Sequence, residues 1–307
     1  MNSGGMDQSA SVFGVKGSAL FIQFKPSLNA TPIAFPSTKP ELAFVITNTL
    51  VDSVKHETAP VNYNLRVVEC TLAAEILARK FGVRDLPQDG PLGSTLHGFL
   101  SKYYEKNGKG EDDPSPDEMA ERLTTAAGLA DKTLTESEGY TREEMAELIG
   151  VDTDSLVEKY MTQYPVRAEK FQLRKRTLHV FEEALRVIKF RQLLISPPGS
   201  SQELFEQLGK LMNESQDSCR DQYQCSCKET DQICALARKH GAAGCRLSGA
   251  GWGGFTVSLI WSDRIEEFVK AITQGYFVHN FPNLGQHELD DAIVVSKPSL
   301  GSAFIMY

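Results

Sequence analysis

Long apolar runs are absent from this sequence. No stretch of its 307 residues approaches the roughly 18 apolar residues that a membrane-spanning helix needs, so no membrane contact is predicted. The first seven residues, from Met1 to Asp7, have neither a basic region nor an apolar stretch, so no secretory signal is predicted. The sequence therefore predicts a cytoplasmic protein.

An excess of positive charge is also missing. Lysine and arginine number 32 against 40 aspartate and glutamate residues, which gives a formal net charge of -8. A protein that binds the phosphate backbone of nucleic acids normally presents a basic face, so no nucleic-acid partner is predicted. The net charge does not argue against one bound nucleotide, because a single loop can hold it locally.

Cysteine pairs at zinc-binding spacing are absent too. Five of the six cysteines lie between Cys219 and Cys245, yet no two have the Cys-x2-Cys spacing of structural zinc sites. Without a secretory signal, reduced thiols are expected. No metal site is predicted in this chain.

Hydrophobic periodicity predicts an α+β protein with helices on one face of an antiparallel sheet. Strands are expected at residues 19–24, 42–46, 245–247, 255–260, 292–295 and 303–306. Helices are expected after Pro60 up to Gly82, from Thr141, and at residues 168–194, 200–212, 229–240 and 265–272. Residues 83–140 change character around the acidic run 111–113 and are predicted to form a solvated surface insertion.

The most informative segment is residues 248–254, Ser-Gly-Ala-Gly-Trp-Gly-Gly. Its Gly-x-Gly-x-x-Gly spacing fits the dinucleotide-binding fingerprint, but that fingerprint opens a helix and here an apolar strand follows at once, so we reject it. A phosphate loop of the Gly-x4-Gly-Lys-Ser/Thr kind is absent from the sequence. Four glycines within six residues exceed what a hairpin needs, which favours a functional packing role over a merely flexible turn.

This segment carries a family resemblance. Residues 246–258 closely resemble the third signature motif of the GHMP sugar kinases, in the tryptophan-containing form typical of fungal galactokinases. Residues 212–215, 225–227 and 293–298 agree in the same order, and residues 4–8 resemble the segment that carries the catalytic aspartate. The resemblance covers essentially the whole chain. It implies the GHMP kinase fold, with a partial N-terminal domain at residues 1–60 and a ferredoxin-like C-terminal domain at residues 61–307 that contains the insertion at about 83–140.

The resemblance also implies an activity, the transfer of the γ-phosphate of ATP to the anomeric hydroxyl of D-galactose in galactose catabolism by the Leloir pathway. Asp7 matches the carboxylate that lies against that hydroxyl, Gly4 matches a backbone contact to galactose, and Tyr63 matches a sugar-binding tyrosine. Without the family, Asp7 would be interpreted as a helix cap and Tyr63 as a core aromatic.

The third motif of the family packs near the ATP phosphates, so Gly249, Ala250 and Gly251 are expected on the nucleotide side. In the family, the phosphate loop precedes the catalytic aspartate, and the Mg2+ ligands are expected to lie in the same upstream part. With the aspartate at position seven, both are expected to be missing from this chain. We therefore expect the isolated chain to expose apolar surface, to be unstable, and to transfer no phosphate.

Two related functions share these motifs and stay open. One is a non-catalytic galactose sensor that binds a transcriptional inhibitor protein and has lost kinase activity through changes in the phosphate loop. The other is N-acetylgalactosamine kinase, against which Tyr63 favours galactose as the substrate.

Overall fold

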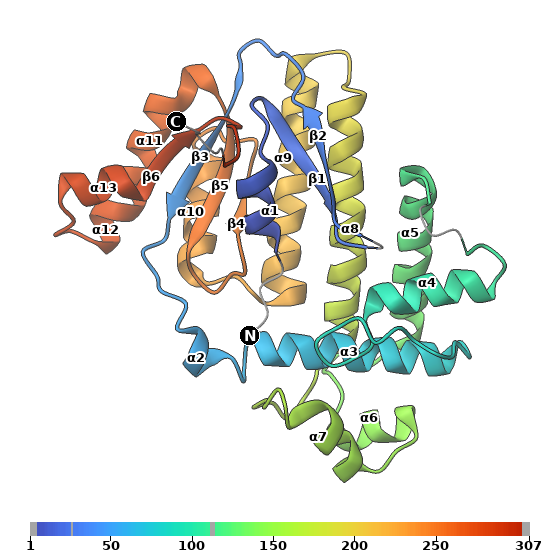
Figure 1. Ribbon diagram of the computed structural model, residues 1–307. Coiled ribbons are helices and arrows are strands. Elements are labelled where there is room, and N and C mark those ends of the chain that lie inside the picture. The colour runs from blue at the N-terminus through green and yellow to red at the C-terminus, as the bar shows by residue number, and fades with distance from the viewer. Residues whose placement is uncertain (1–4, 26, 111–113, 303–307) are drawn as a thin grey trace, which may run out of the picture. The chain divides into compact units, whose positions relative to one another are not determined.

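The computed structural model describes residues 5–25, 27–110 and 114–302, and the chain forms two compact units (Figure 1). Unit 1 comprises Met1–Ser53, Arg186–Arg220 and Gln224–Tyr307, and unit 2 comprises Val54–Leu185 and Asp221–Tyr223. These contact-based units do not test the predicted family domains, 1–60 and 61–307, which stay a prediction. Among the described residues, no helix combines the length and the apolar character needed to cross a membrane.

Unit 1 is built on a four-stranded antiparallel sheet in the order β4-β5-β3-β6. These strands are β4 (Gly244–Ser248), β5 (Phe255–Trp261), β3 (Leu42–Asn48) and β6 (Ile293–Ser296). Period-two alternation turns Ala43 and Val45 of β3 into the core, as expected for a strand with one buried face. The predicted strands and their antiparallel pairing are confirmed, except that residues 303–306 lie outside the described residues.

A second, two-stranded sheet in unit 1 pairs β1 (Ser18–Gln23) with β2 (Asn29–Ala34). The sequence predicted β1 but missed β2, because β2 contains Pro32, a residue that argues against a strand. Here Pro32 pairs opposite Leu20 in a strand whose other side has no partner strand among the described residues, and such an edge needs no donor from proline.

The predicted helices of unit 1 are confirmed, and the structure adds three short ones that were not predicted, α1, α12 and α13. The helices of this unit are α1 (Met6–Phe13), the end of α8 (Leu173–Ile195), α9 (Ser201–Ser218), α10 (Lys228–Lys239), α11 (Ile265–Ile272), α12 (Val278–Asn280) and α13 (Gln286–Ala292), with a π-turn at Thr273–Phe277 and a 3-10 turn at Ser262–Arg264. A further π-turn at Cys219–Tyr223 has its first two residues in unit 1 and its last three in unit 2. Phe268 of α11 and Ile233 of α10 join Val45 and Ile260 of the sheet in one buried cluster. Burial of this apolar stripe is the main force that holds these helices on the sheet.

The close approach of α9 to the edge strand β4 depends on two glycines. A Cβ on Gly209 would lie 2.3 Å from the carbonyl carbon of Ala243, and a Cβ on Gly244 would lie 2.4 Å from the carbonyl oxygen of Gly209. Both distances are shorter than any real contact, so only glycine fits where this helix crosses this strand. The helix thereby covers the side of β4 that pairs with no strand formed by the described residues.

Unit 2 is helical and is centred on α3 (Tyr63–Lys80). Around it lie α2 (Lys55–Thr58), α4 (Leu96–Lys106), α5 (Pro116–Thr133), α6 (Arg142–Ile149), α7 (Thr153–Met161) and the first part of α8. The predicted capping box at the start of α6 is confirmed: the Thr141 hydroxyl accepts from the Glu144 amide, and the Glu144 carboxylate accepts from the Thr141 amide.

The predicted surface insertion, about 83–140, is more ordered than the sequence suggested. It contains α4 and α5, and Phe99 and Ala130 on these helices are fully buried. The charged loop between the helices dominated the sequence interpretation, although the apolar residues on both sides follow a helical period. The acidic run 111–113 itself lies outside the described residues.

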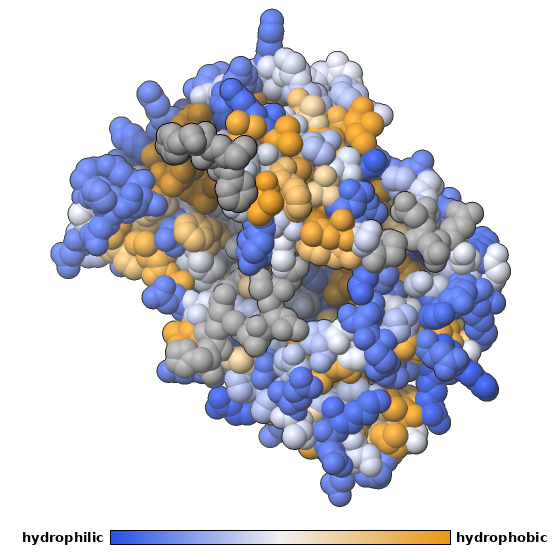
Figure 2. Space-filling view, viewed as in Figure 1, coloured by the Kyte–Doolittle hydropathy of each residue, from blue (hydrophilic) through white to orange (hydrophobic). Residues whose placement is uncertain are grey.

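Apolar side chains are exposed on α1 and on the hairpin formed by β1 and β2. Val12 is 54% exposed, Phe13 46% and Leu28 53%. Figure 2 shows that apolar side chains form several orange groups on the viewed face, separated by polar ones. Exposed apolar side chains also occur in unit 2, for example Leu148 and Val151, so the expectation that a missing segment uncovers apolar surface stays a prediction.

The role of Gly209 can be tested against a second glycine inside a helix. Gly209→Ala is expected to destabilise the protein by about 1–3 kcal/mol, because its methyl group overpacks the contact with β4. Gly128→Ala in α5 is the matched control: its Cβ would meet nothing within 4 Å, so higher helix propensity should stabilise the protein by about 0.5–1 kcal/mol. Urea unfolding followed by circular dichroism measures both, and equal effects of the two variants would contradict the packing argument.

Candidate functional site

The glycine-rich turn joins β4 to β5 and consists of residues 248–254. Most of its residues have positive φ: Gly249 (82°), Gly251 (88°), Trp252 (56°), Gly253 (131°) and Gly254 (78°). This backbone region is easily accessible to glycine and costs other residues roughly 1–2 kcal/mol. The succession of glycines therefore sets the shape of the turn, and the rejection of a helix-opening dinucleotide loop agrees with the β5 strand that follows directly.

One neighbouring segment holds the middle of the turn. The Trp252 amide donates to the carbonyl oxygen of Cys225 at 2.7 Å. A Cβ on Gly251 would lie 2.1 Å from that same oxygen, so no larger residue fits there. The main chain at residue 225 thus packs directly on the main chain of the turn.

The loop after β3 holds the other end of the turn. The Gly254 amide donates to the Val51 carbonyl at 3.1 Å, and the Thr49 amide donates to the Gly254 carbonyl at 2.7 Å. The Tyr276 hydroxyl also holds this loop, because it donates a hydrogen bond to the Thr49 carbonyl at 2.6 Å. Burial raises the pKa of Tyr276, which keeps its hydroxyl protonated as the donor.

The three residues predicted to lie on the nucleotide side, Gly249, Ala250 and Gly251, have two different environments. Gly249 and Ala250 are exposed, and a Cβ on Gly249 would meet nothing within 4 Å. Gly251 is buried against Cys225. The first half of the turn therefore offers open main chain, while the second half is fixed by packing.

Asp7 lies in the first turn of α1, and its side chain is exposed. Gly5 precedes the helix at φ 78°, which is the left-handed region that favours glycine. A carboxylate in the first turn interacts favourably with the helix dipole. Gly4, the predicted sugar-binding glycine, lies outside the described residues.

The end of α1 is tied down by the C-terminal segment of the chain. The Gly301 amide donates to the Gly14 carbonyl at 2.7 Å, and the Ser302 amide donates to the Ser11 carbonyl at 2.8 Å. A Cβ on Gly301 would lie 2.5 Å from the carbonyl oxygen of Val12. Main-chain contact with residues 301–302 therefore helps to fix the helix that carries Asp7.

Tyr63 is the first residue of α3 and is half-buried. It belongs to unit 2, whereas Asp7 and the glycine-rich turn belong to unit 1, and each is described within its own unit. The three residues predicted to face the nucleotide are consecutive in one turn, and of the residues predicted to bind the sugar, Asp7 lies on α1 and Tyr63 on α3.

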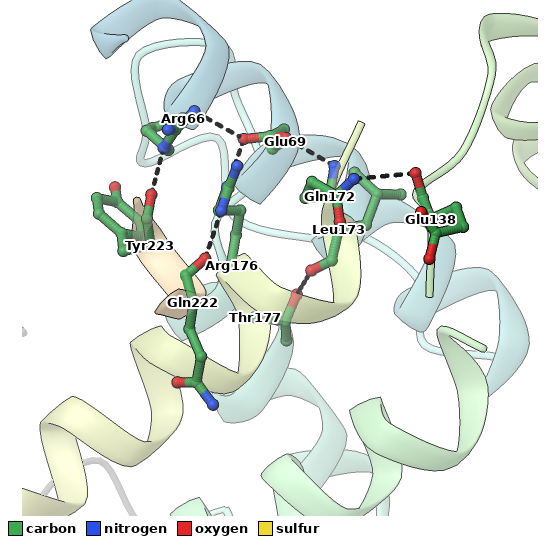
Figure 3. Close-up of polar contacts among 9 residues, drawn as sticks. All are labelled: Arg66, Glu69, Glu138, Gln172, Leu173, Arg176, Thr177, Gln222 and Tyr223. Carbon is green, nitrogen blue, oxygen red and sulfur yellow. Dashed lines mark hydrogen bonds and ion pairs between the residues drawn. The ribbon is translucent and has the colours of Figure 1, made fainter. Parts of the chain in front are cut away.

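A buried group of charged side chains in unit 2 was not predicted from the sequence (Figure 3). The Glu69 carboxylate, fully buried on α3, accepts from Arg176 Nε at 2.7 Å, and it forms an ion pair with Arg66 at 3.3 Å. Its second oxygen accepts from the Gln172 amide at 2.7 Å. Arg66 also donates to the Tyr223 carbonyl at 2.6 Å, so the charges link α3, α8 and the π-turn at 219–223.

The sequence gives little indication of this cluster, because Arg66 and Glu69 look like ordinary i, i+3 surface partners on a helix. Only the fold shows that a third charge, from α8, lies beside them.

The thiol of Cys70 follows Glu69 on α3. Burial, and after it the Glu69 carboxylate, raises the pKa of Cys70 to about 12. That thiol stays protonated near neutral pH and is unsuited to be a nucleophile. In the part of the chain that the structure describes, no three histidine, cysteine or acidic residues are grouped to hold a metal ion.

Comparison with known proteins assigns the family. The family model described as GHMP kinases C terminal matches residues 201–277, which include the glycine-rich turn. The galactokinase of Saccharomyces cerevisiae is 42% identical over 315 residues, covering 98% of this chain and 59% of that protein. The galactokinase of Schizosaccharomyces pombe is 38% identical over 313 residues, covering 99% of this chain and 60% of that protein. This chain is a galactokinase homologue of the GHMP kinase family.

The fold agrees with this assignment. The crystal structure of Lactococcus lactis galactokinase complexed with galactose is similar to the chain with a TM-score of 0.56 and 21% identity, covering 98% of this chain and 55% of that one. The predicted GHMP kinase fold and the α+β class are confirmed. The chain spans about three fifths of the length of the curated relatives described above.

The close contact at Gly251 predicts a difference between two glycines of the same turn. Gly249→Ala and Gly251→Ala both force alanine into positive φ, so this strain, roughly 1–2 kcal/mol, is common to them. Gly251→Ala additionally drives a methyl group into the Cys225 carbonyl and should lose about 1–3 kcal/mol more. Thermal unfolding of the two variants measures this difference, and equal melting temperatures would contradict it.

The buried charges make a second stability prediction. Glu69→Gln removes the charge of a fully buried carboxylate that pairs with both Arg66 and Arg176, and it should destabilise the protein by about 3–5 kcal/mol. Glu105→Gln is the matched control, because Glu105 pairs with Lys102 at the surface and such pairs contribute about 0–1 kcal/mol. Urea unfolding of both variants tests this, and a Glu69→Gln loss no larger than that of the control would refute it.

Proposed function

We propose that this protein is a galactokinase, which transfers the γ-phosphate of ATP to the anomeric hydroxyl of D-galactose. The observation that carries the proposal is the 42% identity to the Saccharomyces cerevisiae galactokinase over 98% of the chain. The geometry supports it through an open glycine main chain suited to phosphates and an exposed carboxylate at a helix start. A cytoplasmic location accompanies this proposal.

The nucleotide side of the proposed site is the first half of the glycine-rich turn. Gly249, Ala250 and Gly251 would lie along the phosphates of ATP, where the absent Cβ of Gly249 lets a phosphate approach the main chain. The packing of Gly251 on Cys225 keeps this main chain in one conformation. A rigid, pre-shaped backbone binds a charged group without a further loss of conformational entropy.

The sugar side consists of Asp7, Gly4 and Tyr63. The anomeric oxygen of galactose attacks the γ-phosphorus, the bond between that phosphorus and the bridging oxygen of ADP breaks, and the hydroxyl proton passes to the Asp7 carboxylate. A carboxylate that lies against this hydroxyl can accept the proton. Tyr63 and the main chain at Gly4 would hold the sugar, since phosphoryl transfer depends mainly on positioning and charge stabilisation.

Mg2+ accompanies ATP in phosphoryl transfer and neutralises charge on the phosphates. In the family resemblance, its ligands belong to the part of the sequence that lies upstream of the catalytic aspartate. We therefore assign no step of the reaction to a metal held by this part of the chain.

Two alternatives arose from the sequence. A galactose sensor that binds a transcriptional inhibitor protein has no support in the comparisons, and N-acetylgalactosamine kinase is not favoured by them. The relatives named above are galactokinases.

A chimera tests the proposal. The matched region of the Saccharomyces cerevisiae galactokinase is replaced by this chain, and ADP release is measured with galactose and with N-acetylgalactosamine. The chimera should turn over galactose, and Asp7→Asn, which keeps the shape but loses the basic oxygen, should lower kcat by roughly 10²–10⁴. This chain alone should release no ADP, since its sequence contains no phosphate-binding loop.

Three results would count against the proposal. They are a chimera without galactose-dependent turnover, an Asp7→Asn chimera with unchanged kcat, and faster turnover of N-acetylgalactosamine than of galactose.

A further inference from the structure

The strand that leads into the glycine-rich turn is held by a buried amide. Gln216 on α9 is fully buried, and its Oε1 accepts from the Leu247 amide at 2.8 Å. Leu247 lies at the end of β4, two residues before Gly249, on the edge of the sheet. A side chain of α9 therefore takes the place of a neighbouring strand at the point where the turn begins.

The nitrogen of the same side-chain amide donates both of its hydrogens. Gln216 Nε2 donates to Ser226 Oγ and to Asp231 Oδ1, both at 2.9 Å, and the Ser226 hydroxyl donates to the same Asp231 oxygen at 2.8 Å. These partners fix which way round the amide lies, because only its oxygen can accept from Leu247 and only its nitrogen can donate to Asp231. In a buried network of this kind, loss of one member leaves the others unsatisfied.

Ser226 connects this network to the middle of the turn. It follows Cys225, the residue whose carbonyl accepts from the Trp252 amide at 2.7 Å. Residues 225 and 226 are thus connected to the turn at two points. Ser226 is linked through Gln216 to Leu247, before the turn, and Cys225 is bonded directly to Trp252, within it. All of these residues belong to unit 1.

We propose that Gln216, Ser226 and Asp231 are positioning residues, which hold the glycine-rich turn in the conformation that receives the phosphates of the nucleotide. This inference rests on the proposed function for the role of the turn, but the hydrogen bonds that carry it are independent of that function. The three side chains act through the main chain at residues 225 and 247 and are not proposed to touch the nucleotide.

A second amide on the same helix provides the control. Asn213 bonds the start of β4 in the same manner: its Nδ2 donates to the Ala243 carbonyl at 2.9 Å, and its Oδ1 accepts from the Cys245 amide at 3.1 Å. Loss of this side chain also leaves main-chain groups of β4 unsatisfied, but at the end of the strand away from the turn. Ser226→Ala and Asn213→Ala therefore compare a loss near the turn with a similar loss away from it.

The first measurement is hydrogen exchange, in the full chain, of the Leu247, Trp252 and Gly254 amides, which donate the hydrogen bonds that hold the turn. Ser226→Ala should speed exchange of these amides about tenfold, since the hydrogen bonds that hold the turn open more often. Ser226→Thr, which keeps the hydroxyl, should leave their rates near wild type, and so should Asn213→Ala. Equal rates in Ser226→Ala and wild type, or equal acceleration by Asn213→Ala, would overturn the proposal.

Tryptophan fluorescence gives an independent spectroscopic measurement. The chain has two tryptophans, Trp252 in the turn and Trp261, which stacks on Phe205 at 4.1 Å. In a Trp261→Phe background, which keeps an aromatic ring on Phe205, all emission comes from Trp252. Ser226→Ala should shift this emission to longer wavelength as the turn becomes more hydrated, Ser226→Thr should restore it, and an unshifted spectrum in Ser226→Ala would contradict the proposal.

Kinetics of the chimera separate this inference from the proposed function. Ser226→Ala should raise the KM for ATP several-fold, on the order of a lost hydrogen bond, while the KM for galactose stays unchanged and Asn213→Ala changes neither. A wild-type chimera without activity would refute the proposed function, and the exchange rates would still decide whether the three residues hold the turn. An active chimera in which Ser226→Ala leaves the KM for ATP unchanged would refute the positioning role.

Discussion

The hydrogen bond from the Trp252 amide to the Cys225 carbonyl is the constraint on which the candidate site depends. It brings two main chains so close that residue 251 has no room for a Cβ, and it requires positive φ at Trp252 itself. A tryptophan in this backbone region is under strain, which persists only where the surroundings over-determine the conformation. Here the surroundings are Cys225 on one side and Val51 on the other, where the carbonyl of Val51 accepts from Gly254.

A second close approach of main chains, between α9 and β4, lies beside the turn. In the described parts of the chain no strand pairs with the outer side of β4, and α9 lies so near this side that Gly209 and Gly244 must both be glycine. The short distance lets the amide of Gln216 reach the main chain of β4. An edge that would otherwise attract another chain is thereby closed by the helix, and the strand that begins the turn is held at the same time.

Much of the fold was predictable from the sequence, whereas the contacts of the site were not. β3 is a short continuous apolar run, α3 has an apolar period near four, and the capping box of Thr141 and Glu144 is a local pattern, so each was found. Local patterns failed where distant residues decide: Glu69 is indistinguishable from a surface carboxylate until Arg176, more than a hundred positions away, lies beside it. The candidate site residues came from a family resemblance, because an exposed aspartate or a half-buried tyrosine has no distinctive pattern of its own.

The four glycines of the turn show how a motif can combine requirements that the sequence does not distinguish. Gly251 and Gly253 lack a side chain because a Cβ would meet the carbonyl oxygen of Cys225 or of Val51, at 2.1 and 2.4 Å. Gly249 and Gly254 face no such neighbour, and their need is positive φ alone. A glycine required only by packing carries no information about a ligand. Contact with phosphate is therefore best sought at the exposed first half of the turn, where an open main chain adjoins a second half that packing holds fixed.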